Sequence, residues 1–372
     1  NAGAKTLIDV IDKTSSPMGS RLMRRWLSLP LKNKEQINAR YDIVDYFVNN
    51  NDLIYKFQDA IRQVGDLERL ISKVSLLRVN PRELLQLARA LDQIEIIKNL
   101  CADSNDDSIK LYAEQLNVCD SIRQKIKRVL NPDSPALISK GNFINDGVDE
   151  ELDDLRALSR SGKEYLTNIQ RREIETTGIS SLKVGFNNVF GYYLEVTNLH
   201  KDKVPAEWIR KQTLANAERY ITEELKEYEQ KILGADEKIH AIEERLYFEL
   251  INACGEFVAP IQLDASLISK IDCLVSFADV ALRNNYVKPT IDDSYVIDIK
   301  EGRHPVIEQM MPVGEQYISN DVYLDRERQQ IIIITGPNMS GKSALLRQTA
   351  LIVLLAQIGC FVPAASARIG LV

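Results

Sequence analysis

The sequence predicts a mainly α-helical protein with a small β-rich insert and an α/β unit at its C-terminal end. Three observations support this fold class. Apolar residues recur at helical spacing through most of the chain, and one internal stretch alternates and is rich in aromatic and β-branched residues. Near the end, a glycine loop separates an apolar strand-like run from an apolar helix-like run. With 372 residues, 45% of them apolar, the chain is long enough for two or three folded domains.

Composition excludes several classes of protein. No run approaches the roughly twenty apolar residues of a membrane span, and the N-terminus lacks the pattern of a secretory signal, so we expect a cytoplasmic protein without membrane association. The five cysteines are scattered and form no C-x-x-C pair, which predicts buried thiols in place of disulfides or a zinc site. The net charge of −6 means that any nucleic-acid contact must come from a local basic patch.

The first 130 residues predict consecutive helices with short connections. A Ser-Pro pair at Ser16 predicts a hydroxyl-capped helix with proline in its first turn. An Asn-Pro pair at Asn80 repeats this pattern before an apolar run at helical spacing. The four cations in residues 123–128 fall on one expected helix, and we interpret them as a solvated face.

Two long helices are expected to flank the β-rich insert as an antiparallel pair of arms. The second helix, from about Tyr220 to Asn252, would be about 50 Å long at 1.5 Å per residue. Its apolar residues are spaced alternately by four and three, which is a heptad seam: Ile221, Leu225, Tyr228, Ile232, Ala235, Ile239, Ile242 and Leu246. The first helix carries a less regular apolar stripe, interrupted at Gly162: Val148, Leu152, Leu155, Leu158, Leu166, Ile169 and Ile174.

Residues 179–214 predict a hairpin at the tip of these arms. Residues 178–219 contain six basic and four acidic side chains, and residues 220–249 contain four basic and nine acidic ones. The tip is therefore positive and its stalk negative, so we expect an anionic partner to meet the tip. Glu195 and Asp202 are interpreted as pairing or solubility charges.

After a further helical stretch to Tyr286, a domain boundary is expected near Pro289. A strand, a loop, a second strand and then the apolar strand Ile331–Ile334 are expected to follow. Gly336 to Ser343 matches the phosphate-loop pattern G-x-x-x-x-G-K-[ST], directly before an apolar helix.

This pattern has a specific chemistry. Glycines let backbone N–H groups converge on phosphate oxygens, and the helix dipole adds to the attraction. Lys342 is expected to neutralise the β and γ phosphates, and Ser343 to ligate Mg²⁺. None of the 29 residues after Ser343 is acidic, so we expect no catalytic residue in this chain. Asp298 precedes the loop and is a weak candidate for the missing acid.

The stretches "TGPNMSGKS", "SPMGSRLMRRWLSLPL", "LKVGFNNVFGYYLEVT", "RKQTLANAERY" and "EGRHPVIE" closely resemble the MutS family of DNA mismatch-repair ATPases, in particular its bacterial mismatch-recognition branch. The resemblance covers nearly the whole chain. It implies a helical core/lever domain at 1–147, coiled-coil-like lever arms and returning core helices at 148–177 and 215–288, and a β-rich DNA clamp at 178–214. It implies the start of a truncated P-loop ATPase domain of ABC type at 289–372.

The family's function follows as an expectation. The resemblance implies a parent protein that binds mismatched double-stranded DNA and ATP and acts as an ATP-dependent mismatch sensor and sliding clamp. It implies a homodimer that works with downstream repair factors in the cytoplasm, around the nucleoid. It also implies that this chain is a fragment without the mismatch-reading domain and the Walker B acids, so the parent hydrolyses ATP to ADP and this chain does not. The alternatives are a coiled-coil P-loop ATPase of another MutS branch and a helical interaction scaffold with a vestigial P-loop.

The resemblance also assigns residues. Tyr317 is expected to stack on adenine, with a core tyrosine at a strand edge as the alternative. Asn338 would lie near the γ-phosphate, and Ala344 departs from the family's usual threonine. The expected nucleotide site is Gly336, Pro337, Asn338, Met339, Ser340, Gly341, Lys342, Ser343 and Tyr317. The expected DNA-backbone contacts, each with an unengaged surface residue as the alternative, are Lys183, Asn187, Asn188, Lys201, Lys203, Arg210 and Lys211.

Overall fold

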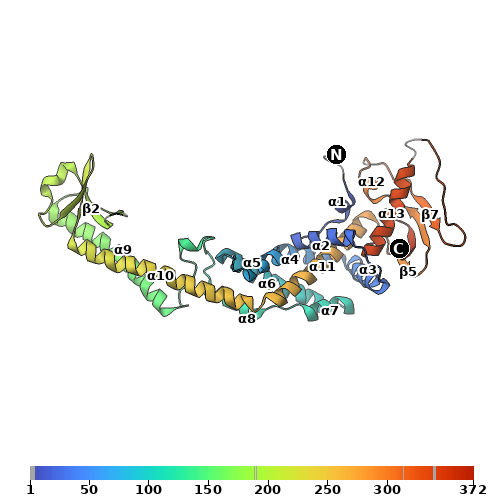
Figure 1. Cartoon of the computed structure of the whole chain (residues 1–372), viewed down its shortest axis with the longest axis horizontal. Helices are drawn as coiled ribbons and strands as arrows, with labels where there is room; N and C mark the ends of the chain where they lie inside the picture. The colour runs from blue at the N-terminus through green and yellow to red at the C-terminus, as the bar shows by residue number, and fades with distance from the viewer. Residues whose placement is uncertain (1–4, 188, 190, 313, 338–340) are drawn as a thin grey trace. The chain divides into compact units, whose positions relative to one another are not determined.

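The computed structural model describes residues 5–187, 189, 191–312, 314–337 and 341–372 (Figure 1). The fold is mainly α-helical with two small sheets, as the sequence predicts. The chain forms two compact units. The core unit comprises the residues up to 79, residues 86–124 and residues from 254 onwards, and the arm unit comprises residues 80–85 and 125–253. No helix in the described ranges combines the length and the apolarity needed to cross a bilayer.

The core unit is built around one buried helix, α11 (Val258–Asn284), against which α2, α3, α4 and α5 pack. The five cysteines are buried free thiols, as predicted. The other helices lie mainly in the core unit, and α6 and α8 also contribute residues to the arm unit: α1 (Leu7–Ile11), α2 (Pro17–Ser28), α3 (Lys34–Asn49), α4 (Asn51–Val64), α5 (Leu67–Ser75), α6 (Pro81–Ala102), α7 (Asp107–Gln115), α8 (Asp120–Val129), α12 (Pro305–Glu308) and α13 (Lys342–Ile358).

The start of α2 is fixed to α11 by a buried carboxylate. Asp272 accepts hydrogen bonds from the Ser15 and Ser16 backbone N–H groups at 2.8 and 2.9 Å and from the Ser16 hydroxyl at 2.6 Å. The Ser16 hydroxyl in turn accepts from the Gly19 N–H at 3.0 Å, which confirms the predicted cap. A Cβ at Gly19 would lie 2.1 Å from the Asp272 carboxylate, so only glycine fits there. Asn80 caps α6 in the same manner, also as predicted.

The α8 cations only partly form the solvated face that the sequence suggests. Lys125, Lys127 and Arg128 are exposed. Arg123 is buried and forms ion pairs with Glu95 and Asp120. The prediction was wrong for Arg123 because its side chain points toward α6, where a carboxylate compensates its charge.

The C-terminal sheet of the core unit has the strand order β5-β8-β6-β7. Its strands are β5 (Thr290–Asp292), β6 (Ile297–Gly302), β7 (Asn320–Leu324) and β8 (Ser366–Gly370), with β5 and β8 parallel and the other neighbours antiparallel.

The predicted strand Ile331–Ile334 is not formed. Residues 331–337 have no regular structure, and Ile331 and Ile333 are 80% and 84% exposed. A strand that is apolar at every position is stable only when neighbours pair with its edges and cover its faces. Among the described strands none pairs with this run, and β7 is the edge of the sheet. The sequence therefore identified a strand-forming segment whose partners the described fold does not supply.

The arm unit contains two long helices, α9 (Glu150–Thr177) and α10 (Glu223–Gly255), which run antiparallel (Figure 1). Three contacts join them along their length. Asp149 forms an ion pair with Arg245, and the Ser159 hydroxyl donates a hydrogen bond to Asp236. The ring centroids of Tyr165 and Tyr228 lie 5.3 Å apart. Of the predicted heptad positions on α10, those buried are Leu225, Tyr228, Ala235 and Ile242, and those half-buried are Ile239 and Leu246. The Ile232 side chain lies outside the described residues.

A four-stranded antiparallel sheet with the order β1-β2-β4-β3 joins these helices. It consists of β1 (Lys183–Asn187), β2 (Gly191–Thr197), β3 (Ile209–Thr213) and β4 (Ala217–Ile221), with the 3₁₀ helix η2 (Asn198–Lys203) between β2 and β3. A second 3₁₀ helix, η1 (Ile138–Lys140), precedes α9. The predicted helix start at Tyr220 was wrong. Tyr220 pairs with Leu194 in the sheet, and the Thr222 hydroxyl then accepts the Leu225 N–H at the start of α10.

A buried ion pair ties the base of the arms together. The Glu243 carboxylate is fully buried and accepts from Arg156 at 2.6 Å and from the Asn142 N–H at 3.0 Å. Removing one partner of a buried pair leaves the other charge uncompensated.

We expect Glu243→Ala to lower the free energy of unfolding by about 3 kcal/mol, measured by urea denaturation. Glu244→Ala, at the exposed neighbouring position, should change it by less than about 0.5 kcal/mol; equal effects would contradict this role.

Asp264 on α11 should make stability depend on pH. Burial raises its pKa to about 7, because the carboxylate accepts only the Asn117 N–H and its Oδ2 has no hydrogen-bond partner in the described structure. The folded state therefore binds the proton more tightly than the unfolded chain, whose pKa is about 3.9, and this group destabilises progressively as pH rises from about 4 to about 7. The free energy of unfolding of Asp264→Asn, minus that of the wild type, should therefore be larger at pH 8 than at pH 5. Urea unfolding of both proteins at both pH values measures this difference. A pH-independent difference would refute the assignment.

Candidate functional site

The glycine loop leads directly into α13. Gly341 occupies the N-cap position with φ of +85°, a conformation that glycine adopts without strain, and Lys342 is the first helical residue. The Lys342 ammonium turns back to the loop and donates to the carbonyl of Gly336 and, at 3.1 Å, to that of Pro337. A cation at the positive end of α13 therefore lies against the first two residues of the loop.

A cavity of about 620 Å³ opens beside this loop. Gly341, Lys342 and Ala344 line it from one side, and Tyr317 and Ile318 line it from the segment before β7. The Tyr317 hydroxyl donates to the Gln348 Oε1 at 3.0 Å, which anchors the ring to α13. The fold thus places an aromatic ring and the cationic end of the glycine loop in the lining of one cavity.

Not every residue of the expected nucleotide site lines that cavity. Gly336, Pro337 and Ser343 are exposed beside it, and the Ser343 hydroxyl lies in the first turn of α13. Asn338, Met339 and Ser340 lie outside the described residues. Asp298 sits within β6, forms an ion pair with Lys300 at 3.5 Å and does not line the cavity.

Gln348 is the residue that sequence reasoning missed. It is fully buried, and its amide nitrogen has no hydrogen-bond partner in the described residues while its oxygen accepts from Tyr317. The available signal was weak, because Gln348 stands between Arg347 and Thr349 and nothing in the sequence shows that it is buried.

The sheet of the arm unit carries a polar row across one face. The register places Lys183 opposite Glu195, and Glu195 opposite Arg219. Arg219 donates to Glu195 at 2.9 Å and to Gln212 at 2.9 Å, and its guanidinium stacks over the Tyr193 ring at 4.4 Å. Glu195 is thus a pairing charge, as predicted. The opposite face packs in the apolar cluster that includes Leu194, Val196 and Tyr220.

The expected DNA-contacting residues do not share one face. Lys183 lies on the polar row, whereas Arg210 pairs in register with Tyr220 on the opposite face and forms an ion pair with Glu218 at 3.2 Å. Lys201 and Lys203 project from η2, and Lys211 occupies the irregularity in the β3–β4 pairing. All of these cations are exposed. Asn187 holds the β1–β2 turn by accepting the Val189 N–H, and Asn188 lies outside the described residues.

Comparisons with known proteins match both parts of the chain. A family model described as MutS domain III matches residues 1–278, and one described as MutS domain V matches residues 332–372. Proteins named DNA mismatch repair protein MutS from Flavobacterium johnsoniae and Parabacteroides distasonis are 60% and 61% identical to the chain over 372 residues. The protein of that name from Porphyromonas gingivalis is 55% identical. Each match covers the whole chain but 43%, 43% and 42% of the relative, so the chain spans less than half of their length.

Proposed function

Because the chain belongs to the MutS family, we propose that it carries the nucleotide-binding loop and the DNA clamp of an ATP-dependent mismatch sensor. One observation carries the nucleotide part. The cationic end of the glycine loop and Tyr317 line the same cavity of about 620 Å³. A nucleotide has an anionic end and an aromatic end, and the cavity offers a complement to each.

The residues of the loop suit a phosphate chain. The Lys342 ammonium donates to two loop carbonyls, and phosphate oxygens are stronger acceptors that would receive these hydrogen bonds instead. α13 begins at Lys342, and the free backbone N–H groups and the dipole of a helix N-terminus favour an anion. The Ser343 hydroxyl, exposed in the first turn, would hold Mg²⁺. When bound, Mg²⁺ would supply positive charge that neutralises the phosphates, and ATP would supply the triphosphate. We propose that the whole protein hydrolyses ATP to ADP.

At the other end of the nucleotide, the Tyr317 ring is held in place by Gln348. A ring fixed by a hydrogen bond presents its face to a base without further loss of side-chain freedom. Gln348 thus acts as a positioning residue in this proposal.

The arm unit supplies the proposed clamp. Lys201 and Lys203 are exposed on η2, and no ion pair forms at either within the described chain. Cations without a protein partner are available to phosphates, and such contacts hold a duplex without reading its sequence. The sheet, extended by β4 to Ile221, would be the clamp, and α9 and α10 would be the lever arms that join it to the helical core. The whole protein is proposed to act on mismatched duplex DNA as a homodimer.

Labelled ATP with Mg²⁺ tests the nucleotide site. Lys342→Ala should weaken binding at least about ten-fold, because a charge-assisted contact is lost. Tyr317→Ala should weaken it by about five-fold or more through lost stacking, while Tyr317→Phe retains the ring. Lys32→Ala removes an exposed core-unit lysine away from the loop and serves as the control. Equal binding by the Lys342 variant and the control would indicate a vestigial loop on a helical scaffold.

Fluorescence anisotropy with a labelled duplex tests the clamp. We expect weak binding that falls as salt rises, with little preference for a mismatched duplex. Lys201→Gln with Lys203→Gln should lower the slope of log affinity against log salt by about two, roughly 0.9 for each lost phosphate contact. The control is Lys226→Gln with Lys238→Gln, which removes the same charge from α10. In this control, most of the slope of log affinity against log salt should remain. Strong mismatch discrimination, or a salt-independent affinity, would contradict the proposal.

A further inference from the structure

A second cavity of the core unit, of about 410 Å³, opens to solvent and is lined by residues of α2, α3, α7 and α11. Its polar lining consists of Arg40, Lys270, Tyr112 and Gln36, and Trp26 contributes an aromatic wall. It lies apart from the glycine loop and shares no lining residue with the nucleotide cavity.

Arg40 carries a charge that the described protein does not compensate. Its guanidinium stacks 3.5 Å above the Trp26 ring, and one nitrogen donates to the Ile358 carbonyl at 2.6 Å. No ion pair forms at Arg40 in the described chain, and burial lowers its pKa to about 10. Arg40 is half-buried, removing a cation from water without an anionic partner is costly, and a guanidinium has five N–H donors of which one is used here.

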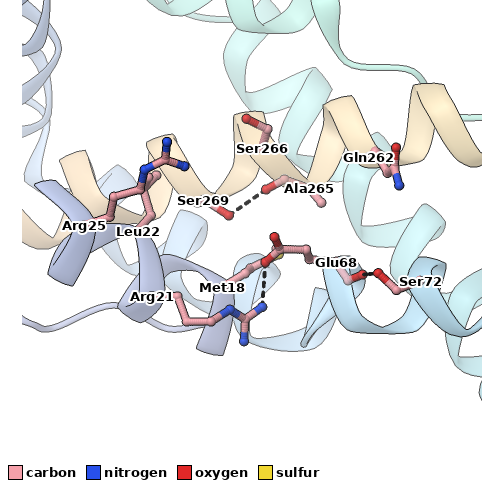
Figure 2. Close-up of a pocket in the computed structure, with 10 residues that line it drawn as sticks. All are labelled: Met18, Arg21, Leu22, Arg25, Glu68, Ser72, Gln262, Ala265, Ser266 and Ser269. Atoms are coloured by element: carbon pink, nitrogen blue, oxygen red, sulfur yellow. Dashed lines mark hydrogen bonds and ion pairs between the residues drawn. The ribbon is translucent and has the colours of Figure 1, made fainter.

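A neighbouring cavity of the same volume provides a comparison within the molecule. Figure 2 shows Arg21 beside that cavity, with its guanidinium directed to Glu68. Arg21 also pairs with Asp66 at 2.7 Å, and the hydroxyls of Ser72 and Ser269 donate to carbonyls of their own helices. Arg21, Ser72 and Ser269 of that cavity are thus satisfied by the protein. The Arg40 cavity differs because its lining contains two cations and no carboxylate.

Two further donors line the Arg40 cavity, the exposed Lys270 and the half-buried Tyr112. Lys270 forms no ion pair, and the Tyr112 hydroxyl no hydrogen bond, in the described structure. Burial raises the pKa of Tyr112 to about 12, so its phenol is a proton donor at neutral pH. A guanidinium, an ammonium and a phenol in the lining of one cavity form a donor set that matches an oxyanion.

We propose that this cavity binds a small oxyanion, a phosphate or a carboxylate group, through Arg40, Lys270 and Tyr112. The anion neutralises Arg40 while one guanidinium nitrogen keeps its bond to Ile358, at the C-terminal end of α13. The aromatic Trp26 face fixes the guanidinium plane, which leaves the in-plane N–H groups for the ligand. The proposal does not depend on nucleotide or DNA binding.

The test uses the full chain with Lys342→Ala, so that the glycine loop does not contribute to phosphate binding. The thermal midpoint is measured against sodium phosphate, and separately against sodium acetate, with sodium chloride holding the ionic strength constant. We expect a saturable rise of about 2 °C at a ten-fold excess over the dissociation constant. The anion whose shift of the thermal midpoint saturates at the lower concentration is the preferred ligand.

Arg40→Met also removes the packing of Arg40 on Trp26 and so changes stability by itself, and the decisive variants are therefore Lys270→Met and Tyr112→Phe. Loss of the ammonium should raise the half-saturating concentration about ten-fold, and loss of the hydroxyl about five-fold. Arg25→Met, which removes an exposed arginine beside the neighbouring cavity, should leave it unchanged. The proposal is overturned if neither anion gives a saturable shift, or if the two variants respond like the Arg25 control.

Discussion

The buried carboxylate of Asp272 is the constraint on which the core unit depends. It fixes the first turn of α2 to α11 and leaves no room for a side chain at Gly19. That register places Trp26 of α2 against Phe277 of α11, with ring centroids 6.0 Å apart, and below Arg40 of α3. Arg40 and Tyr41 then hold the carbonyls of Ile358 and Ala356 at the end of α13. The helix that begins at the glycine loop is thus positioned through a continuous series of polar and aromatic contacts that starts at one aspartate.

The sequence predicts local features well and environment-dependent ones poorly. The caps at Ser16 and Asn80 depend on residues three positions apart, and the heptad seam of α10 depends on spacing alone, so both are visible in the sequence. The strand at Ile331–Ile334 was wrong because strand formation needs partners elsewhere in the chain. The start of α10 was misplaced because Tyr220 fits both a heptad and an alternating strand, and only pairing with β2 decides between them.

The same distinction applies to the candidate sites. The glycine loop is contiguous, so its residues can be grouped from the sequence. The contact of Tyr317 with Gln348 spans 31 positions, and that of Arg40 with Ile358 spans 318. Neither follows from residue type, because an arginine on an amphipathic helix is normally a solvated charge. For the exposed cations of the arm-unit sheet, the count of charges predicted that residues 178–219 are positive. It did not predict which face of the sheet each cation occupies.

The exposed isoleucines at 331–333 have a consequence for how the chain behaves in solution. A short run of β-branched residues without charge or proline is the sequence signature of segments that stack against identical copies of themselves. Here that run is exposed and unpaired, so self-association should begin at this segment and increase with protein concentration. The nearest flanking residues that oppose stacking are Arg328 on one side and Pro337 on the other. Self-association of the chain therefore depends on this run and on the two residues that flank it.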